Sequence, residues 1–285
     1  MRRDCYFCHR RTIERLLDKF HLSEERAEEF DREINTFIQK NWRLCNPLLA
    51  THIQRIAKSY FGKSDLYYYE KITANQLLLK EYQSWEQLIK RNKNSFHTAA
   101  KLAVIGTIID YGAHSVPQSL QQFIGDKLKE PLAIDQTEEL KKEILKASSV
   151  LYLGDNAGEI VFDKLFIQQI RHPALTYAVR GAAVLNDVTE KDAQMADMAN
   201  CCSIISNGSD APSTLLNLCN ESFRRIFNAA DLIISKGQGN FEGLMDQHKK
   251  KIYFLLMAKC EPIAELLNVS KGSMIIKKNT TAYGI

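Results

Sequence analysis

Long apolar runs, an export-type leader and regularly spaced cysteines are all missing from this 285-residue sequence. No apolar run approaches the roughly 20 residues that a membrane-spanning helix needs. The first residues lead into an amphipathic stretch, without the apolar centre of a signal peptide. Seven cysteines form an odd set without framework-like spacing, which favours free thiols in a reducing compartment. We therefore expect a cytoplasmic protein with no membrane partner.

A charge of one predominant sign is also missing. The 38 basic and 34 acidic residues give a formal net charge of +4, and no long basic block with interleaved aromatic residues occurs. No nucleic-acid partner is therefore expected. Hydrophobic residues make up 45% of the chain and charged residues 25%, which is typical of a folded globular protein and excludes a largely disordered one. The oligomeric state cannot be predicted from these features.

Apolar residues at helical spacing fill the chain up to about residue 140. The i, i+3, i+4, i+7 pattern of one helix face is formed by Ile13, Leu16, Leu17 and Phe20, and again by Ala27, Phe30, Ile34 and Phe37. Ser23 is a candidate N-cap, and Pro47 and Gly62 mark the ends of a third helix. The letters SWEQ predict another helix start at Ser84 with a capping box. The segment AAKLAVIGTIIDYG (99–112) predicts a helix buried from several sides.

From about Ser148 short apolar runs alternate with helical stretches. The runs are SSVLYL, ALTYAV, CSIIS, DLIIS and MIIK, and the helical stretches include FDKLFIQQI, EKDAQMADMA and TLLNLCNESFRRIF. Such alternation is typical of βαβ units and a parallel sheet covered by helices. We therefore predict an α/β fold, with a three-layer, Rossmann-like, mainly parallel sheet in residues 93–285 and a helical subdomain in residues 1–92. The boundary could also lie near residue 145.

Polar, glycine-bearing segments follow four of these runs directly. They are GDNAGE (154–159), Arg180-Gly181 with NDVT (186–189), NGSD (207–210) and KGQGNFE (236–242). Ligands of open α/β sheets bind beyond the carboxyl ends of the strands. One edge of the sheet is therefore expected to collect all four segments.

Asp155, Asn156 and Asp187 supply hard oxygen donors within these segments, and no His/Cys cluster accompanies them. Such donors suit magnesium or manganese better than zinc. Lys236 adds a positive charge, and Gly237 allows backbone N–H groups to approach an anion closely. A metal, a lysine and backbone donors together suit a phosphoryl group.

Several candidate residues also have a purely structural interpretation. Asp155 could be the N-cap of the following helix, and Asn186-Asp187 could be a turn followed by a cap. Cys5 and Cys8 have the spacing of half a zinc site, but a packed pair of thiols is favoured because partners are lacking.

Three other phosphate-related patterns are disfavoured. The glycines 237, 239 and 243 approximate a dinucleotide fingerprint, but no acidic residue ends a following strand. No Gly-Lys-Ser/Thr ending follows the first strand, which excludes a Walker loop. Ala157 stands where the aspartyl-phosphate phosphatases carry a second Asp, so a covalent intermediate on Asp155 is disfavoured.

Taken in order, the motifs GDNAGE, NDVT after Arg180, NGSDAPST and KGQGNFE resemble those of the damage-control phosphatases, also called domain of unknown function 89. The likeness extends to FGKSDLYYYEKITAN, to AAKLAVIGTIIDYG and to the N-terminal Cys5-x-x-Cys8 pair. Two departures are Thr107, where the family usually has Asn, and Ser213, where it often has Gly.

The resemblance implies hydrolysis of phosphate monoesters of small metabolites, such as sugar phosphates or phosphopantetheine-like compounds, by a divalent ion (Mg, Mn, Co or Ni). Asp155, Asn156 and Asp187 would hold this ion, and Glu159 could order a water. The candidate phosphate-binding residues are Lys236, Gly237, Asn240, Arg180, Asn186 and Asp210. His97 and Asp110 are candidates for the cleft wall. The alternatives are an S-adenosylmethionine-dependent carboxyl methyltransferase and a non-catalytic phosphometabolite-binding protein.

Overall fold

The structure is a computed structural model that describes residues 3–107 and 120–280. Helices come first along the chain: α1 (Arg3–Phe20), α2 (Glu24–Lys40), α3 (Asn46–Phe61), α4 (Tyr68–Lys80), α5 (Tyr82–Arg91), α6 (Ser95–Gly106) and α7 (Leu120–Lys129). Strands then alternate with helices, which confirms the α/β fold.

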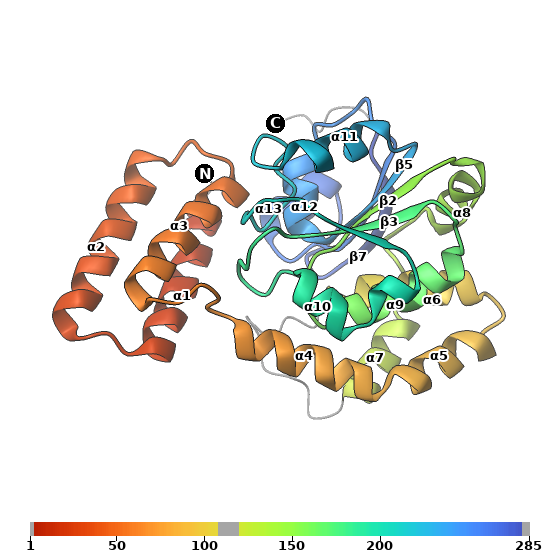
Figure 1. Cartoon of the computed structure of the whole chain (residues 1–285), viewed down its shortest axis with the longest axis horizontal. Helices are drawn as coiled ribbons and strands as arrows, with labels where there is room; N and C mark the ends of the chain where they lie inside the picture. Colours follow the sequence, from red (N-terminus) through yellow and green to blue (C-terminus); the bar gives the residue numbers. More distant parts are fainter. Residues whose placement is uncertain (1–2, 108–119, 281–285) are drawn as a thin grey trace.

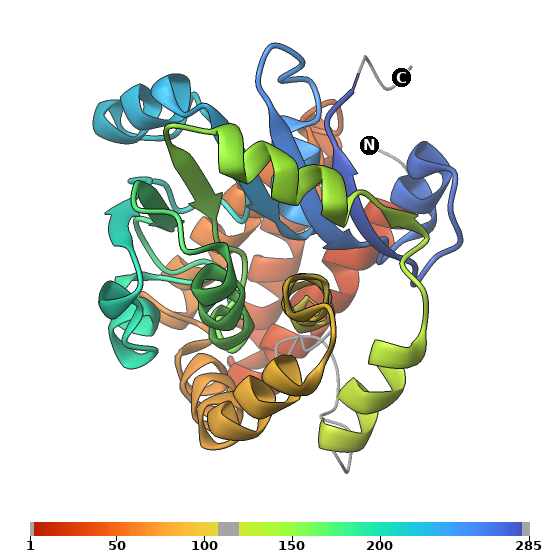
Figure 2. The same cartoon turned by 90° about the vertical axis from the view of Figure 1, so that its right-hand side faces the viewer.

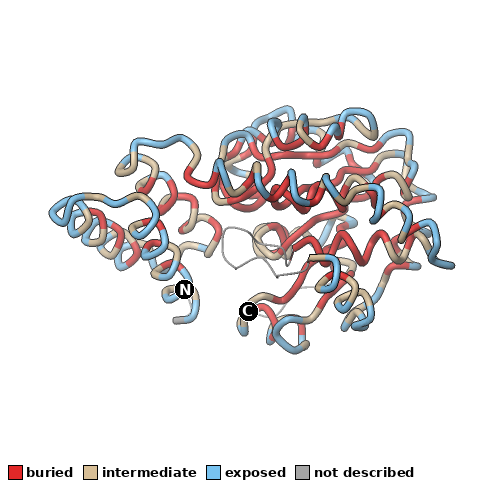
Figure 3. Tube along the Cα trace, turned by 90° about the horizontal axis from the view of Figure 1, so that it is seen from below, coloured by how far each residue is buried: buried red, intermediate tan, exposed pale blue. Residues whose placement is uncertain are grey.

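The helices α1, α2 and α3 pack on one another and form the part at the left of Figure 1. Their shared core contains Ile13, Leu16, Phe30 and Ile34, the residues whose spacing predicted two of these helices. The helix α3 ends at Gly62, which adopts the left-handed conformation that glycine tolerates best. Figure 3 shows exposed outer sides for these helices, whereas buried stretches run through the α/β part.

The sheet has the order β1-β7-β6-β5-β2-β3-β4. Its strands are β1 (Ile134–Asp135), β2 (Val150–Leu153), β3 (Leu175–Val179), β4 (Ser203–Ser206), β5 (Leu232–Lys236), β6 (Ile252–Met257) and β7 (Met274–Lys278). Neighbouring strands are parallel except β6 and β7, which pair antiparallel. The chain runs from β2 outward to β3 and β4, and then returns to β5 on the other side of β2. This reversal is a topological switch point, and open α/β sheets bind ligands in the crevice outside the carboxyl ends of the strands at such a point, here those of β2, β3 and β5.

Helices cover both faces of the sheet, as Figure 2 shows for α4, α5 and α6 on one side and α11 on the other. The remaining helical elements are α8 (Thr137–Lys146), α9 (Ile160–Ile170), α10 (Glu190–Met195), η1 (Met198–Asn200), α11 (Glu221–Ala229), α12 (Gly237–Leu244) and α13 (Glu261–Leu267). Buried side chains of α4 and α5, among them Leu78 and Trp85, join the core on the α6 and α9 side. The proposed boundary at residue 92 stays a prediction.

Three local predictions need correction. The helix α5 begins at Tyr82, so Ser84 lies inside it and does not cap it. The predicted helix TLLNLCNESFRRIF is helical only from Glu221, because the side chain of Asn220 accepts a hydrogen bond from the Phe223 amide and caps α11 there. The strand β6, IYFLLM, was not predicted, although it is an apolar run of six residues. Residues 108–112 of the predicted helix 99–112 lie outside the described residues.

Within the described ranges, no helix is long and apolar enough to cross a membrane.

Candidate metal and phosphate site

The segments after β2 and β3 are joined by their backbones. Asn156 and Asp187 form an isolated antiparallel bridge, and the Val188 amide donates to the Asp155 carbonyl at 2.8 Å. Gly154 is required at the end of β2, since a Cβ there would lie 2.4 Å from the Tyr177 hydroxyl oxygen. The fold therefore brings Asp155, Asn156 and Asp187 together, as the sequence predicted.

These three side chains are almost fully buried, with exposed fractions of 7% for Asp155, 6% for Asn156 and 3% for Asp187. Asn156 Nδ2 donates to Asp155 Oδ2 at 2.8 Å and to Glu159 Oε2 at 3.2 Å. Burial, with the nearby charge of Asp187, raises the pKa of Asp155 to about 7. The site therefore holds negative charge that a cation would stabilise.

The donor set fits a hard divalent cation. It contains two carboxylates and one amide, which are ligand types of magnesium and manganese. Residues 3–107 and 120–280 contain no group of three or more His, Cys, Asp or Glu side chains that could hold a metal, so the proposed donor set depends on two carboxylates and one amide. Gly237 at the start of α12 leaves room for this set, because a Cβ at that residue would lie 1.9 Å from Asp155 Oδ2.

Lys236 ends β5 and has no exposed surface. Its Nζ donates to Glu159 Oε1 and, at 2.6 Å, to Asp163 Oδ1. Burial alone lowers the pKa of Lys236, but the two carboxylates outweigh it and raise that pKa. Burial also raises the pKa of Glu159 to about 8, against the opposing charge of Lys236.

Asp163 completes this buried network. Its carboxylate accepts hydrogen bonds from the Tyr152 hydroxyl at 2.7 Å and the Tyr177 hydroxyl at 2.9 Å. Sequence reasoning missed Asp163. The available signal was an acid four residues after Glu159, on the same face of an otherwise apolar helix.

Arg180 follows β3 and bonds to the metal-ligand segment. Its Nε donates to Asp187 Oδ2 at 2.7 Å, and its Nη2 donates to Asn240 Oδ1 at 3.0 Å. Asn240 in turn donates through Nδ2 to the carbonyl oxygens of Gly154 and Lys236. Both predicted residues thus lie at the crevice, where they join the ends of β2, β3 and β5.

The other predicted residues lie as follows. Asn186 is buried, and its carbonyl accepts from the Ala157 amide at 2.9 Å. Asp210 pairs with Arg55 of α3 through two hydrogen bonds of 2.8 and 2.6 Å, so it ties the helical part to the α/β part. His97 bonds to Asp135 Oδ2 at 2.9 Å, at the β1 edge of the sheet and not at the crevice.

Asp110 lies outside the described residues. The two departures from the family pattern are both buried. The Thr107 hydroxyl donates to the Val104 carbonyl, and the Ser213 hydroxyl donates to the Gly239 carbonyl in the first turn of α12.

The capping interpretation of Asp155 does not hold, because the N-cap of α9 is Glu159. The interpretation of Asn186-Asp187 as a turn followed by a cap is confirmed. The Asp187 amide donates to the Val184 carbonyl at 3.0 Å and closes a turn, and Thr189 then caps α10 in a capping box with Asp192. Asp187 itself is not the cap.

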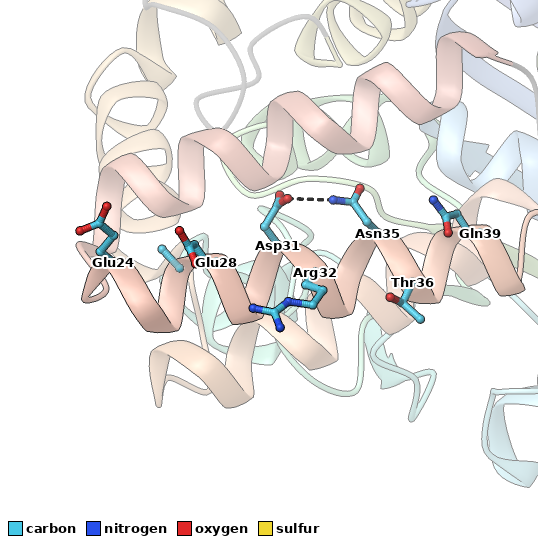
Figure 4. A pocket seen from close by; sticks show the side chains of 8 residues that line it. Glu24, Glu28, Asp31, Arg32, Asn35, Thr36 and Gln39 are labelled. Atoms are coloured by element: carbon cyan, nitrogen blue, oxygen red, sulfur yellow. Dashed lines mark hydrogen bonds between the residues drawn. The ribbon is translucent and has the colours of Figure 1, made fainter.

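The surface hollows of the described residues include one near the site and one along α2. One of about 810 Å³ lies between the segment joining α3 to α4 and the segment after β3; its lining includes Lys63, Tyr68, Tyr69, Arg180 and Lys191. The other runs along α2, where Asn35 bonds to Asp31 (Figure 4), and contains no predicted site residue. Only the first hollow reaches the site, through Arg180.

A crevice with hard oxygen ligands beside the start of a helix is typical of α/β proteins that act on phosphorylated ligands. Comparison with known proteins narrows this class. The protein-family model of the damage-control phosphatase ARMT1-like domain matches residues 1–275 of this chain. A damage-control phosphatase of Pyrococcus horikoshii is 35% identical over 224 residues, which cover 77% of each chain. One from Archaeoglobus fulgidus is 34% identical over 241 residues, which cover 82% of this chain and 83% of the relative.

A solved structure agrees with these matches. The crystal structure of a DUF89 family protein from Pyrococcus horikoshii has a TM-score of 0.87 and 28% identity, and the match covers 98% of this chain and 99% of that one. This chain belongs to the damage-control phosphatase family, which confirms the resemblance of its motifs.

Proposed function

We propose that this phosphatase hydrolyses phosphate monoesters of small metabolites with a divalent ion held by Asp155, Asn156 and Asp187. The observation that carries the proposal is the convergence of these three buried oxygen ligands at the crevice between β2, β3 and β5. When bound, the ion supplies charge neutralisation at the phosphoryl oxygens. Magnesium, manganese, cobalt and nickel all accept such ligands.

The protein's own residues orient the site. Glu159 accepts the Asn156 Nδ2 hydrogen bond, which fixes the plane of the amide, and Lys236 in turn holds Glu159. In the metal-free protein, burial raises the pKa of Glu159 although the charge of Lys236 opposes this shift. The start of α12 at Gly237 adds backbone N–H groups that suit an anion.

Several finer assignments stay predictions. The first is direct contact of the phosphate with Lys236, Arg180, Asn186, Asn240 and Asp210. The second is the ordering of a water molecule by Glu159. The absence of a nucleic-acid partner and the cytoplasmic location also stay predictions. The ammonium group of Lys236 already bonds to Glu159 and Asp163, and the guanidinium group of Arg180 bonds to Asp187. Arg180 therefore supports the proposal by holding one of the proposed ligand residues in place.

The test is hydrolysis of p-nitrophenyl phosphate and of a panel of sugar and phosphopantetheine-type phosphates, each with magnesium, manganese, cobalt or nickel. We expect metal-dependent turnover that Asp155→Ala and Asp187→Ala abolish. Asp126→Ala is the matched control, because this exposed acid lies on α7, where it pairs with Lys129 at 2.9 Å. Full activity in both site variants would refute the proposal. Binding of phosphate esters without turnover would favour the non-catalytic alternative, and tight metal-independent binding of S-adenosylmethionine would favour the methyltransferase.

A further inference from the structure

Helix α4 contacts both segments that carry the proposed metal ligands. Asn75, which is fully buried, accepts a hydrogen bond at Oδ1 from the Gly158 amide at 2.6 Å. Gly158 has a φ of +77°, and a Cβ there would lie 2.9 Å from the Ala74 Cβ, so this turn packs tightly on α4. The turn is part of the GDNAGE segment, which contains Asp155 and Asn156.

The side-chain nitrogen of Asn75 bonds toward the second segment, which contains Asp187. Asn75 Nδ2 donates to Asp192 Oδ1 at 2.9 Å. Asp192 Oδ2 accepts from the Thr189 amide at 2.8 Å and from its hydroxyl at 2.6 Å. Thr189 follows Asp187 by two residues. The Asp192 carboxylate therefore holds the backbone just after this proposed ligand.

A lysine balances the charge of this cluster. Lys71, one turn before Asn75 on α4, lies with its Nζ 3.4 Å from Asp192 Oδ2 and 3.0 Å from Asp65 Oδ2. Lys71 and Asp192 are both buried, so each needs a partner. The amide of Asn75 is therefore held in one orientation by a fixed donor on one side and a fixed acceptor on the other.

We propose that Asn75 is a positioning residue for the metal site. It joins the segment of Asp155 and Asn156 to the segment of Asp187 through a single buried amide. Metal ligands must keep a fixed separation, and loss of an outer partner typically weakens metal binding about 10- to 100-fold. The proposal rests on the metal site proposed above, and its test measures metal binding directly, without turnover.

The experiment is a calorimetric titration of Mn²⁺ into the full chain and its variants, at a temperature where circular dichroism shows each to be folded. Asn75→Ala is expected to raise the Kd for Mn²⁺ about 10-fold or more. Leu78→Ala is the matched control, because Leu78 is buried on the same helix and packs in the apolar core. It should lower the Tm but change the Kd by less than about 3-fold.

An exchange of the side-chain amide of Asn75 with the carboxylate of Asp192 gives a second test, which does not require Asn75→Ala to fold. Asn75→Asp keeps an acceptor for the Gly158 amide but places a second carboxylate beside Asp192, which should weaken Mn²⁺ binding. Combining it with Asp192→Asn restores one carboxylate and one amide with their roles reversed. The double variant should bind Mn²⁺ more tightly than Asn75→Asp, a coupling that a simple loss of stability would not produce.

The outcomes separate the two proposals. An unchanged Kd in Asn75→Ala, or an equal loss in Leu78→Ala, would overturn the positioning role while leaving the metal site in place. A wild-type protein that binds no Mn²⁺ would overturn the metal site itself. Recovery in the double variant, with an unaffected Leu78→Ala control, would support the positioning role.

Discussion

Substitution of Lys236 by methionine tests the buried charge network under the site. Methionine has a similar length but carries neither the positive charge nor the N–H donors of lysine. In the wild type, Lys236 Nζ lies 2.6 Å from Asp163 Oδ1, and neither side chain has exposed surface. Loss of one partner from a buried ion pair costs about 3–5 kcal/mol, because the other charge remains buried without compensation.

The structure places the expected cost near the lower end of that range. Tyr152 and Tyr177 would still donate to Asp163, and hydrogen bonds to charged groups contribute about 1.5–3 kcal/mol each. We therefore expect Lys236→Met to lower the free energy of unfolding by about 3 kcal/mol at pH 7, or the Tm by about 6 °C at this chain length.

The assay is urea unfolding of the metal-free protein followed by circular dichroism. Lys90→Met is the control, because Lys90 is exposed and should change stability by no more than about 0.5 kcal/mol. Adding Asp163→Asn to Lys236→Met should recover part of the loss, since the uncompensated charge is then removed. A free energy of unfolding of Lys236→Met within about 1 kcal/mol of the wild-type value would refute the reasoning. A double variant whose loss of stability equals the sum of the losses in the two single variants would refute it as well.

Two further predictions concern the surroundings of the site. Gly237→Ala should weaken Mn²⁺ binding in calorimetry, because its Cβ would lie 1.9 Å from Asp155 Oδ2 and φ is +78° at this residue; unchanged affinity would contradict the packing of α12 on Asp155. Asp210→Asn should lower stability by about 0.5 kcal/mol at pH 7 in urea unfolding, since its partner Arg55 is well exposed. The Arg55 hydrogen bond lowers the pKa of Asp210, so this contribution is present above the unfolded pKa and is lost as the pH falls through the folded pKa. A stability difference that persists at about pH 2 would show that it has another origin.

The sheet could largely be predicted from the sequence because each run is short and apolar, and four of the runs lead into a glycine-bearing segment. The strands β2, β3, β4, β5 and β7 coincide with the predicted runs to within two residues at each end. The convergence of Asp155, Asn156 and Asp187 could be predicted for the same reason, since parallel strands place their carboxyl ends at one edge. The helical start at Glu221 could not, because it depends on a side-chain cap within a continuous apolar pattern.

The supporting residues were missed because their partners are distant in sequence. Asn75 bonds to groups 83 and 117 residues away, and no periodic pattern around it indicates those contacts. Lys236 was predicted at the site, but its burial against Glu159 and Asp163 depends on the packing of α9 on β5. Composition and spacing predict the candidate ligand residues, whereas tertiary packing determines which neighbours contact them.

The most direct test of the metal site is a crystal structure with Mn²⁺ or Co²⁺ bound, measured with anomalous diffraction. We predict one strong anomalous peak at about 2.0–2.2 Å from side-chain oxygens of Asp155, Asn156 and Asp187. A strong peak elsewhere, with none between these three side chains at saturating metal, would contradict the account.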